Sequence, residues 1–197
     1  MNDTAGPSSE LEDFAQSMAD SFSSFLLALR EIAREGDAGP GISLLLLELS
    51  QISLAGARLG AQQDFEPREE YQPDVGESDL DEMRMRLGAM LDNLDTYSYV
   101  FDPYVPGVVE SQLSDDLTSI ASDLENGLRH YRAGDIDEAL WWWQFSYVSS
   151  WGNLAGAVLN ALLSIVSHDR LDIDVDLDAD QVAAADEMLA GDAEPPR

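Results

Sequence analysis

The stretch LWWWQFSYVSSWGNLAGAVLNAL, residues 140–162, decides the fold class of this chain. Its apolar residues recur every three or four positions, the spacing of one helix face: Trp143, Tyr147, Trp151, Leu154, Val158 and Leu162. Trp142 and Phe145 widen that face, so we expect a central helix surrounded by several others. Three adjacent tryptophans cannot all point to one side of a helix, and we therefore expect Trp141 or Trp142 at the surface.

Other segments with helical spacing complete the predicted bundle. Helices are expected over residues 9–35, 40–62, 78–101 and 114–134, with the tryptophan-rich helix over 135–167. Residues 44–47 are four leucines, apolar on every side, which predicts deep burial of the second helix. The proline-containing segment 101–109 is expected to pack back on the bundle, because apolar residues flank Tyr104. The predicted fold is all-α, a single up-and-down bundle of about five main helices with an acidic, partly disordered C-terminal tail.

Composition shifts along the chain give the expected boundaries. Residues 1–8 are small and polar and are predicted to be disordered, and residues 9–168 form the bundle domain. Residues 169–197 are an acidic tail with a possible short helix near 180–189. Acidic and apolar residues alternate over 172–180 with the period of a strand, but the sequence offers no partner strand. The loop at 63–77 is rich in proline and acid; we interpret it as an exposed loop within one domain, and an interdomain linker is the alternative.

The charge of the chain excludes some classes of partner. The net charge is −29, all ten basic residues are arginine, and there is no cysteine. Such a charge opposes binding to nucleic acid and to anionic membranes, and it favours basic partners, although solubility alone also explains it. Without cysteine, disulfides and thiolate metal sites are ruled out, which favours a cytoplasmic location. The acidic N-terminus does not resemble a secretion signal, and we expect no transmembrane helix.

Catalytic and metal-binding motifs are weak or missing in the sequence. The two histidines, His130 and His168, each lie in the last turn of a predicted helix, where we expect exposed side chains that complement the helix dipole. A calcium loop beginning at Asp176 would need glycine at its sixth position, where Gln181 stands. We therefore assign no catalytic residue, metal or cofactor, and a non-enzymatic role is the favoured interpretation.

The favoured hypothesis is a protein-interaction or adaptor module. Its contact surface would combine an acidic loop with exposed aromatic side chains. The candidate residues are Asp64, Glu66, Glu69, Glu70, Tyr71, Tyr104, Trp141 and Trp142. The partner is an unknown protein, of a basic class if the charge guides binding, and the sequence does not define the oligomeric state.

Two alternative functions stay open at this stage. The protein is a nucleic-acid mimic that occupies the basic groove of a repair or recombination protein if its carboxylates lie along one convex face. It is a small-molecule-binding protein or an enzyme if the bundle encloses a pocket with convergent polar groups. The distribution of acids and the filling of the bundle distinguish these hypotheses.

The segment from Leu140 to Leu162 resembles the signature region of a bacterial family catalogued as domain of unknown function 5063. The matching residues are Trp143, Phe145, Trp151 and Gly152. FLLALREI, ISLLLLELSQISLAGARLGAQ and DDLTSIASDLENGLRHYRAGD resemble its actinobacterial members, so the resemblance covers about residues 18–170. It implies a helical bundle and no activity. Distant members carry a charged residue or histidine near the position of Asn153, so no catalytic group transfers to this chain.

Overall fold

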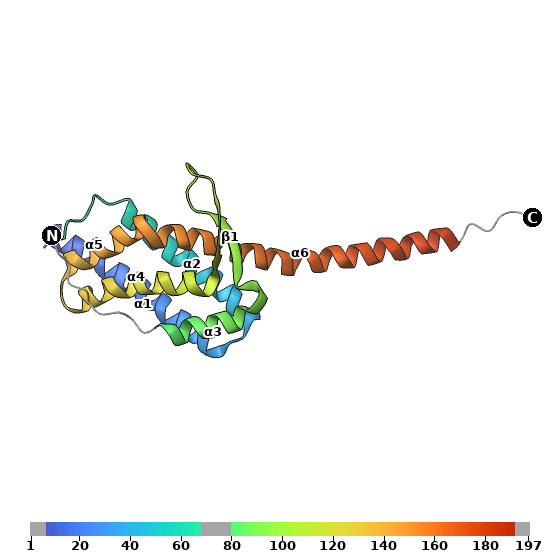
Figure 1. The fold of residues 1–197 in the computed structure, drawn as a ribbon, viewed down its shortest axis with the longest axis horizontal. Helices are drawn as coiled ribbons and strands as arrows, with labels where there is room; N and C mark the ends of the chain where they lie inside the picture. Colours follow the sequence, from blue (N-terminus) through green and yellow to red (C-terminus); the bar gives the residue numbers. More distant parts are fainter. Residues whose placement is uncertain (1–6, 68–79, 192–197) are drawn as a thin grey trace, which may run out of the picture. The chain divides into compact units, whose positions relative to one another are not determined.

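The computed structural model describes residues 7–67 and 80–191 and confirms a mainly helical bundle (Figure 1). Its helices are α1 (Pro7–Glu35), α2 (Ala38–Gly60), α3 (Asp81–Leu91), α4 (Leu113–Arg132), α5 (Ile136–Ser146) and α6 (Gly152–Gly191). A 3₁₀ turn (Asp92–Leu94), strands β1 (Thr96–Val100) and β2 (Val108–Gln112), and a π-helix (Tyr147–Trp151) complete the order. The chain divides into two compact units after Leu162: the first holds the bundle, and the second holds the rest of α6.

The tryptophan-rich segment forms the centre of the core, as its spacing predicts. Trp143 and Trp151 are fully buried, and the ring of Phe22 from α1 meets both edge-on, with centroids 5.1 and 5.8 Å away. The indole N–H of Trp143 donates to the carbonyl of Leu124 in α4 at 3.0 Å. The largest side chains of the core therefore join α1, α4 and α5. The buried indole N–H of Trp143 has a hydrogen-bond acceptor there.

The tryptophan-rich helix is interrupted by a π-turn that the sequence did not predict. The N–H of Gly152 donates to the carbonyl of Tyr147, five residues earlier. A side chain at Gly152 would overlap that carbonyl, and one at Gly56 of α2 would overlap the rings of Tyr147 and Trp151. Glycine at position 152 leaves room for the carbonyl of Tyr147 within the π-turn, and glycine at position 56 lets α2 approach that turn closely.

The π-turn also brings Ser150 to Asp123 of α4, where the hydroxyl donates to the carboxylate at 2.9 Å. Burial raises the pKa of Asp123 above its ordinary value of 3.8, and the hydrogen bond from Ser150 partly opposes the shift. A carboxyl with a raised pKa binds protons more tightly in the folded state. Its contribution to stability is therefore greatest below pH 3.8 and is lost as the pH rises through the folded pKa.

Asp123→Asn should consequently stabilise the protein more at pH 7 than at pH 4, because the amide avoids the cost of burying a charge and can still accept from Ser150. Urea unfolding of both forms across this range measures the difference. Ser150→Ala provides the control, since it removes the donor, leaves the buried carboxylate and should destabilise most at neutral pH. An Asp123→Asn protein that is less stable than the wild type at pH 7 would contradict the assignment.

The prediction that the leucines of α2 are buried on every side is wrong. Leu45, Leu49 and Ile52 are in the core, whereas Leu44, Leu47 and Leu54 are exposed. α2 therefore packs with one face only and leaves an apolar face in contact with solvent. By length and composition alone, α2 and the segment Ile136–Leu171 could each cross a membrane, a property that they share with core helices of water-soluble proteins.

The third predicted helix ends earlier than its apolar spacing suggests. α3 stops at Leu91, where Asp92 adopts a positive φ of 48°, a conformation that aspartate tolerates better than most residues. After the 3₁₀ turn, the segment TYSYV forms β1, and four of its five residues are β-branched or aromatic. β1 pairs with β2 in antiparallel register, with Tyr97 opposite Ser111 and Val100 opposite Val108.

The last helix extends beyond the end that its apolar spacing predicts. Helix α6 continues past the expected end at residue 167 as far as Gly191, through the residues whose alternation has the period of a strand. The short helix expected at 180–189 lies within it. Of the residues expected to be disordered, 1–8 and 191–197, positions 1–6 and 192–197 lie outside the described residues, whereas residues 7 and 8 belong to α1 and Gly191 to α6.

Candidate interaction surface

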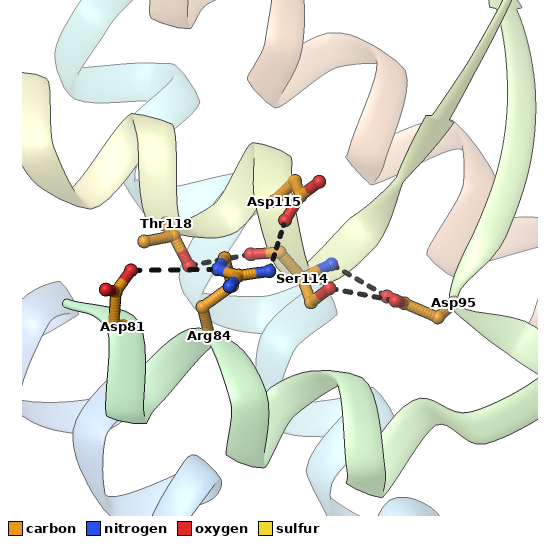
Figure 2. A network of polar contacts seen from close by, with 6 residues as sticks. All are labelled: Asp81, Arg84, Asp95, Ser114, Asp115 and Thr118. Atoms are coloured by element: carbon orange, nitrogen blue, oxygen red, sulfur yellow. Dashed lines mark hydrogen bonds and ion pairs between the residues drawn. The ribbon is translucent and has the colours of Figure 1, made fainter.

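The β1–β2 hairpin is attached to the bundle by a buried carboxylate. Asp95 lies directly before β1 and is only 7% exposed. Its carboxylate accepts from the backbone N–H and from the hydroxyl of Ser114, each at 2.8 Å, in the first turn of α4 (Figure 2). The backbone carbonyl of Asp95 accepts from the N–H of Leu113. Asp95 therefore caps the first turn of α4.

Arg84 of α3 lies beside this cap and bridges two helices. Its guanidinium contacts the carboxylate of Asp115 at 3.3 Å and that of Asp81 at 3.9 Å (Figure 2). Thr118, one turn further along α4, donates its hydroxyl to the carbonyl of Ser114. The contact between Arg84 and Asp115 thus joins α3 to the first turn of α4, beside the cap formed by Asp95.

Tyr97 fixes the face of β1 that is turned toward the helices. Its hydroxyl donates to the buried carboxylate of Asp116 in α4 at 2.6 Å, and its ring stacks on Tyr99 with centroids 5.4 Å apart. Burial, followed by the hydrogen bond to the carboxylate, strongly raises the pKa of Tyr97, so the phenol keeps its proton. The base of the hairpin is thus held by two buried aspartates, Asp95 and Asp116.

The tip of the hairpin is apolar and exposed, and it stands away from the helices of the bundle in Figure 1. Tyr104 is 93% exposed, Val108 77% and Val105 73%. The exposed large apolar side chains of this segment, hereafter the hairpin tip, are Val100, Phe101, Tyr104, Val105, Val108 and Val109. The expectation that residues 101–109 pack back on the bundle is therefore wrong, because the hairpin holds their side chains in solvent.

The other predicted surface residues lie on different elements. Asp64 and Glu66 are exposed, and the N–H of Phe65 between them donates to the side chain of Gln144 in α5 at 2.8 Å. This hydrogen bond connects the acidic loop to α5, the helix that also carries Trp141 and Trp142. Glu69, Glu70 and Tyr71 lie outside the described residues.

Trp141 and Trp142 are both half-buried, consistent with the geometric limit on three adjacent tryptophans. Their rings meet edge-on at 5.1 Å, and Trp141 stacks on Phe145 at 5.2 Å. His130, expected to be exposed, is buried to 5% exposure beneath Trp142. Its burial follows from α5 folding back on α4, which places Trp142 over the last turn of α4.

Among residues 9–67 and 80–171, whose side chains the structure describes, no group of three or more histidine, aspartate or glutamate side chains is placed to hold one metal ion. The buried carboxylates of Asp95 and Asp116 are instead engaged by protein donors. The sequence did not single out Asp95 or Asp116, and the β-branched and aromatic residues of TYSYV were the one local signal of a strand beside them.

Comparisons with known proteins give a family and a fold. The family described as Domain of unknown function (DUF5063) matches residues 9–168. The crystal structure of protein BF1032 from Bacteroides fragilis is similar with a TM-score of 0.61 and 17% identity, over 75% of this chain and 89% of that chain. This similarity shows a shared fold alone. No curated protein matches the sequence.

Proposed function

Since the chain belongs to the DUF5063 family, whose description assigns no activity, we propose its function from its surface. The protein is an interaction module that docks a protein partner through the hairpin tip. The observation that carries this proposal is the density of exposed apolar side chains between Val100 and Val109. Contiguous apolar patches on a protein surface commonly mark binding sites.

The chemistry of the hairpin tip defines the class of partner. Tyr104 supplies an aromatic anchor of the kind enriched at the centres of interfaces, and valines surround it. The net charge of −29 would steer a basic protein toward this surface. We therefore expect a partner with an apolar pocket rimmed by arginine or lysine.

The base of the hairpin supports this role by limiting its motion. The hydrogen bonds of Asp95 and Tyr97 hold both strands against α4 before any partner arrives. A surface that is ordered in advance loses less conformational entropy on binding. The acidic loop at Asp64 and Glu66, with Trp141 and Trp142, forms a second part of the proposed surface.

The proposal extends to the source and location of the protein. The use of arginine without lysine supports an actinobacterial member of the family, as do the segments that resemble such members. The absence of cysteine supports the cytoplasm, where thiols stay reduced and disulfides are not needed.

Affinity capture with paired variants tests the hairpin tip as the docking surface. The wild-type chain serves as bait in lysate of the native host at low and at high salt. We expect capture to slow at high salt but to persist, because apolar anchoring is not screened as charge attraction is. Val105→Ser with Val108→Ser should abolish capture.

The matched control replaces two equally apolar, exposed residues of α2, Leu47→Ser with Leu54→Ser. It lowers surface apolarity by a similar amount and should leave capture intact. Capture that survives the hairpin variant and disappears with the α2 variant would move the interface to α2 and refute the proposal.

A further inference from the structure

A hollow of about 250 Å³ lies between α1 and α3 and brings three arginine side chains together. It is lined by Arg30, Ala33, Arg34, Leu80, Glu82, Met83 and Arg86. Three of the ten basic residues of a chain with net charge −29 therefore gather at one place. At physiological salt, exposed charges more than about 8 Å apart are largely screened, so a ligand in the hollow experiences mainly these guanidiniums and the glutamates paired with them.

The guanidinium groups keep donors available for a ligand. Each carries five N–H donors in a planar fork. Arg30 and Arg86 each reach one glutamate through Nη2, and Arg34 reaches Glu31 through Nε and Nη2. Among contacts between described residues, Nη1 of each of the three arginines is not engaged.

The existing ion pairs are of a kind that a ligand can rearrange. The side chains of Arg30, Arg34 and Arg86 are about half exposed in these pairs. Exposed pairs of this type contribute little to stability, because water screens them and the long side chains lose freedom. An anion that meets two or three guanidiniums at once therefore competes well with a single glutamate.

The floor of the hollow is apolar. Ala33, Leu80 and Met83 are each buried to 9% exposure or less, and they lie beneath the rim of arginines. Glu82 is the one acidic residue among the described residues of the lining, and its carboxylate is paired with Arg86. The hollow combines an anion-binding rim with a surface for a short apolar group.

We propose that this hollow binds a small phosphate monoester, with its phosphate on the three guanidiniums and its apolar part on Leu80 and Met83. A phosphate carries up to two negative charges and three acceptor oxygens, which suits several guanidinium forks better than one carboxylate does. Typical small-molecule pockets measure roughly 300–1,000 Å³, so the ligand is at the small end of that class. This site is independent of the hairpin tip.

The full chain with ¹³C-labelled methionine methyl groups tests this assignment by NMR. Titration with phenyl phosphate should shift the Met83 methyl signal saturably and leave that of the core residue Met18 unchanged. Met83→Leu identifies the signal. Inorganic phosphate should bind more weakly at the same place, and phenol should produce no saturable shift.

A matched pair of variants separates a site from a general charge effect. Arg86→Gln should weaken phenyl phosphate binding about tenfold, the scale of one charge-assisted hydrogen bond. Arg132→Gln removes the same charge from an exposed position outside the hollow and should leave binding unchanged. Equal shifts with phenol, equal weakening by both variants, or no saturable shift of Met83 would each overturn the proposal.

Discussion

Gly127→Ala is expected to lower the free energy of unfolding by about 3 kcal/mol, as overpacking and a lost buried hydrogen bond combine. Gly127 is a buried residue of α4, and a Cβ there would overlap the indole nitrogen of Trp143. Trp143 is fully buried, and its N–H donates to the carbonyl of Leu124. The indole can avoid the methyl group only by leaving that acceptor or by forcing α4 and α5 apart.

Gly156→Ala is the matched control for this prediction. Gly156 is also a helical glycine, but a Cβ there meets nothing within 4 Å. The substitution should be neutral or should stabilise by up to about 1 kcal/mol, the difference in helix propensity between the two residues. Thermal unfolding of both variants gives the comparison. A Gly127→Ala protein as stable as Gly156→Ala would show that α4 and α5 are not in such close contact.

Asp95→Ala is expected to cost about 3 kcal/mol, because it leaves two buried donors of Ser114 without their charged acceptor. The loss should concentrate in the hairpin, since Asp95 joins the start of β1 to the first turn of α4. Amide hydrogen exchange should therefore accelerate most for residues 96–112. Hydrogen exchange at the amides of α1 and α5 should accelerate only by the amount that the loss of global stability explains.

Asp95→Asn separates the loss of charge from the loss of the side chain. The amide oxygen can still accept from the N–H of Ser114, so the expected cost is only about 1 kcal/mol. The asparagine variant should also keep most of the protection of the hairpin amides. Equal effects of the alanine and asparagine variants would mean that the cap depends on the charge itself, and no effect of either would remove Asp95 from the support of the hairpin.

Much of the bundle could be predicted from local sequence. The apolar spacing around Trp143 and Trp151 correctly indicated a buried central face, and the breaks near residues 36 and 134 correctly separated helices. Each of these features depends on residues within a few turns of one another. Helical periodicity and turn-forming glycines record such local preferences directly.

The features that were missed depend on residues far apart in the chain. Nothing near Asp95 shows that Ser114 will supply its donors, and nothing near Gly127 shows that Trp143 will lie against it. The hairpin was missed for a different reason: the five residues TYSYV fit both the end of a helical stripe and a short strand. Pairing with residues 108–112 decides between them.

The interaction surface could be predicted only in part. Tyr104 was chosen for its apolar neighbours, and the structure places it at the end of a hairpin rather than on the bundle. The arginine-lined hollow was not foreseen, because Arg86 of α3 meets Arg30 and Arg34 of α1 only after the helices pack. Sequence spacing cannot reveal a cluster that is assembled from separate helices.

Site-specific photo-crosslinking in living cells of the native host tests the hairpin tip most directly. A photoreactive amino acid replaces Tyr104 in one strain and Leu54 of α2, a comparably apolar and exposed residue, in another. Docking through the hairpin tip predicts a discrete crosslinked protein from position 104 and none from position 54. A discrete product from position 54 alone, or none from position 104, would contradict docking through the hairpin.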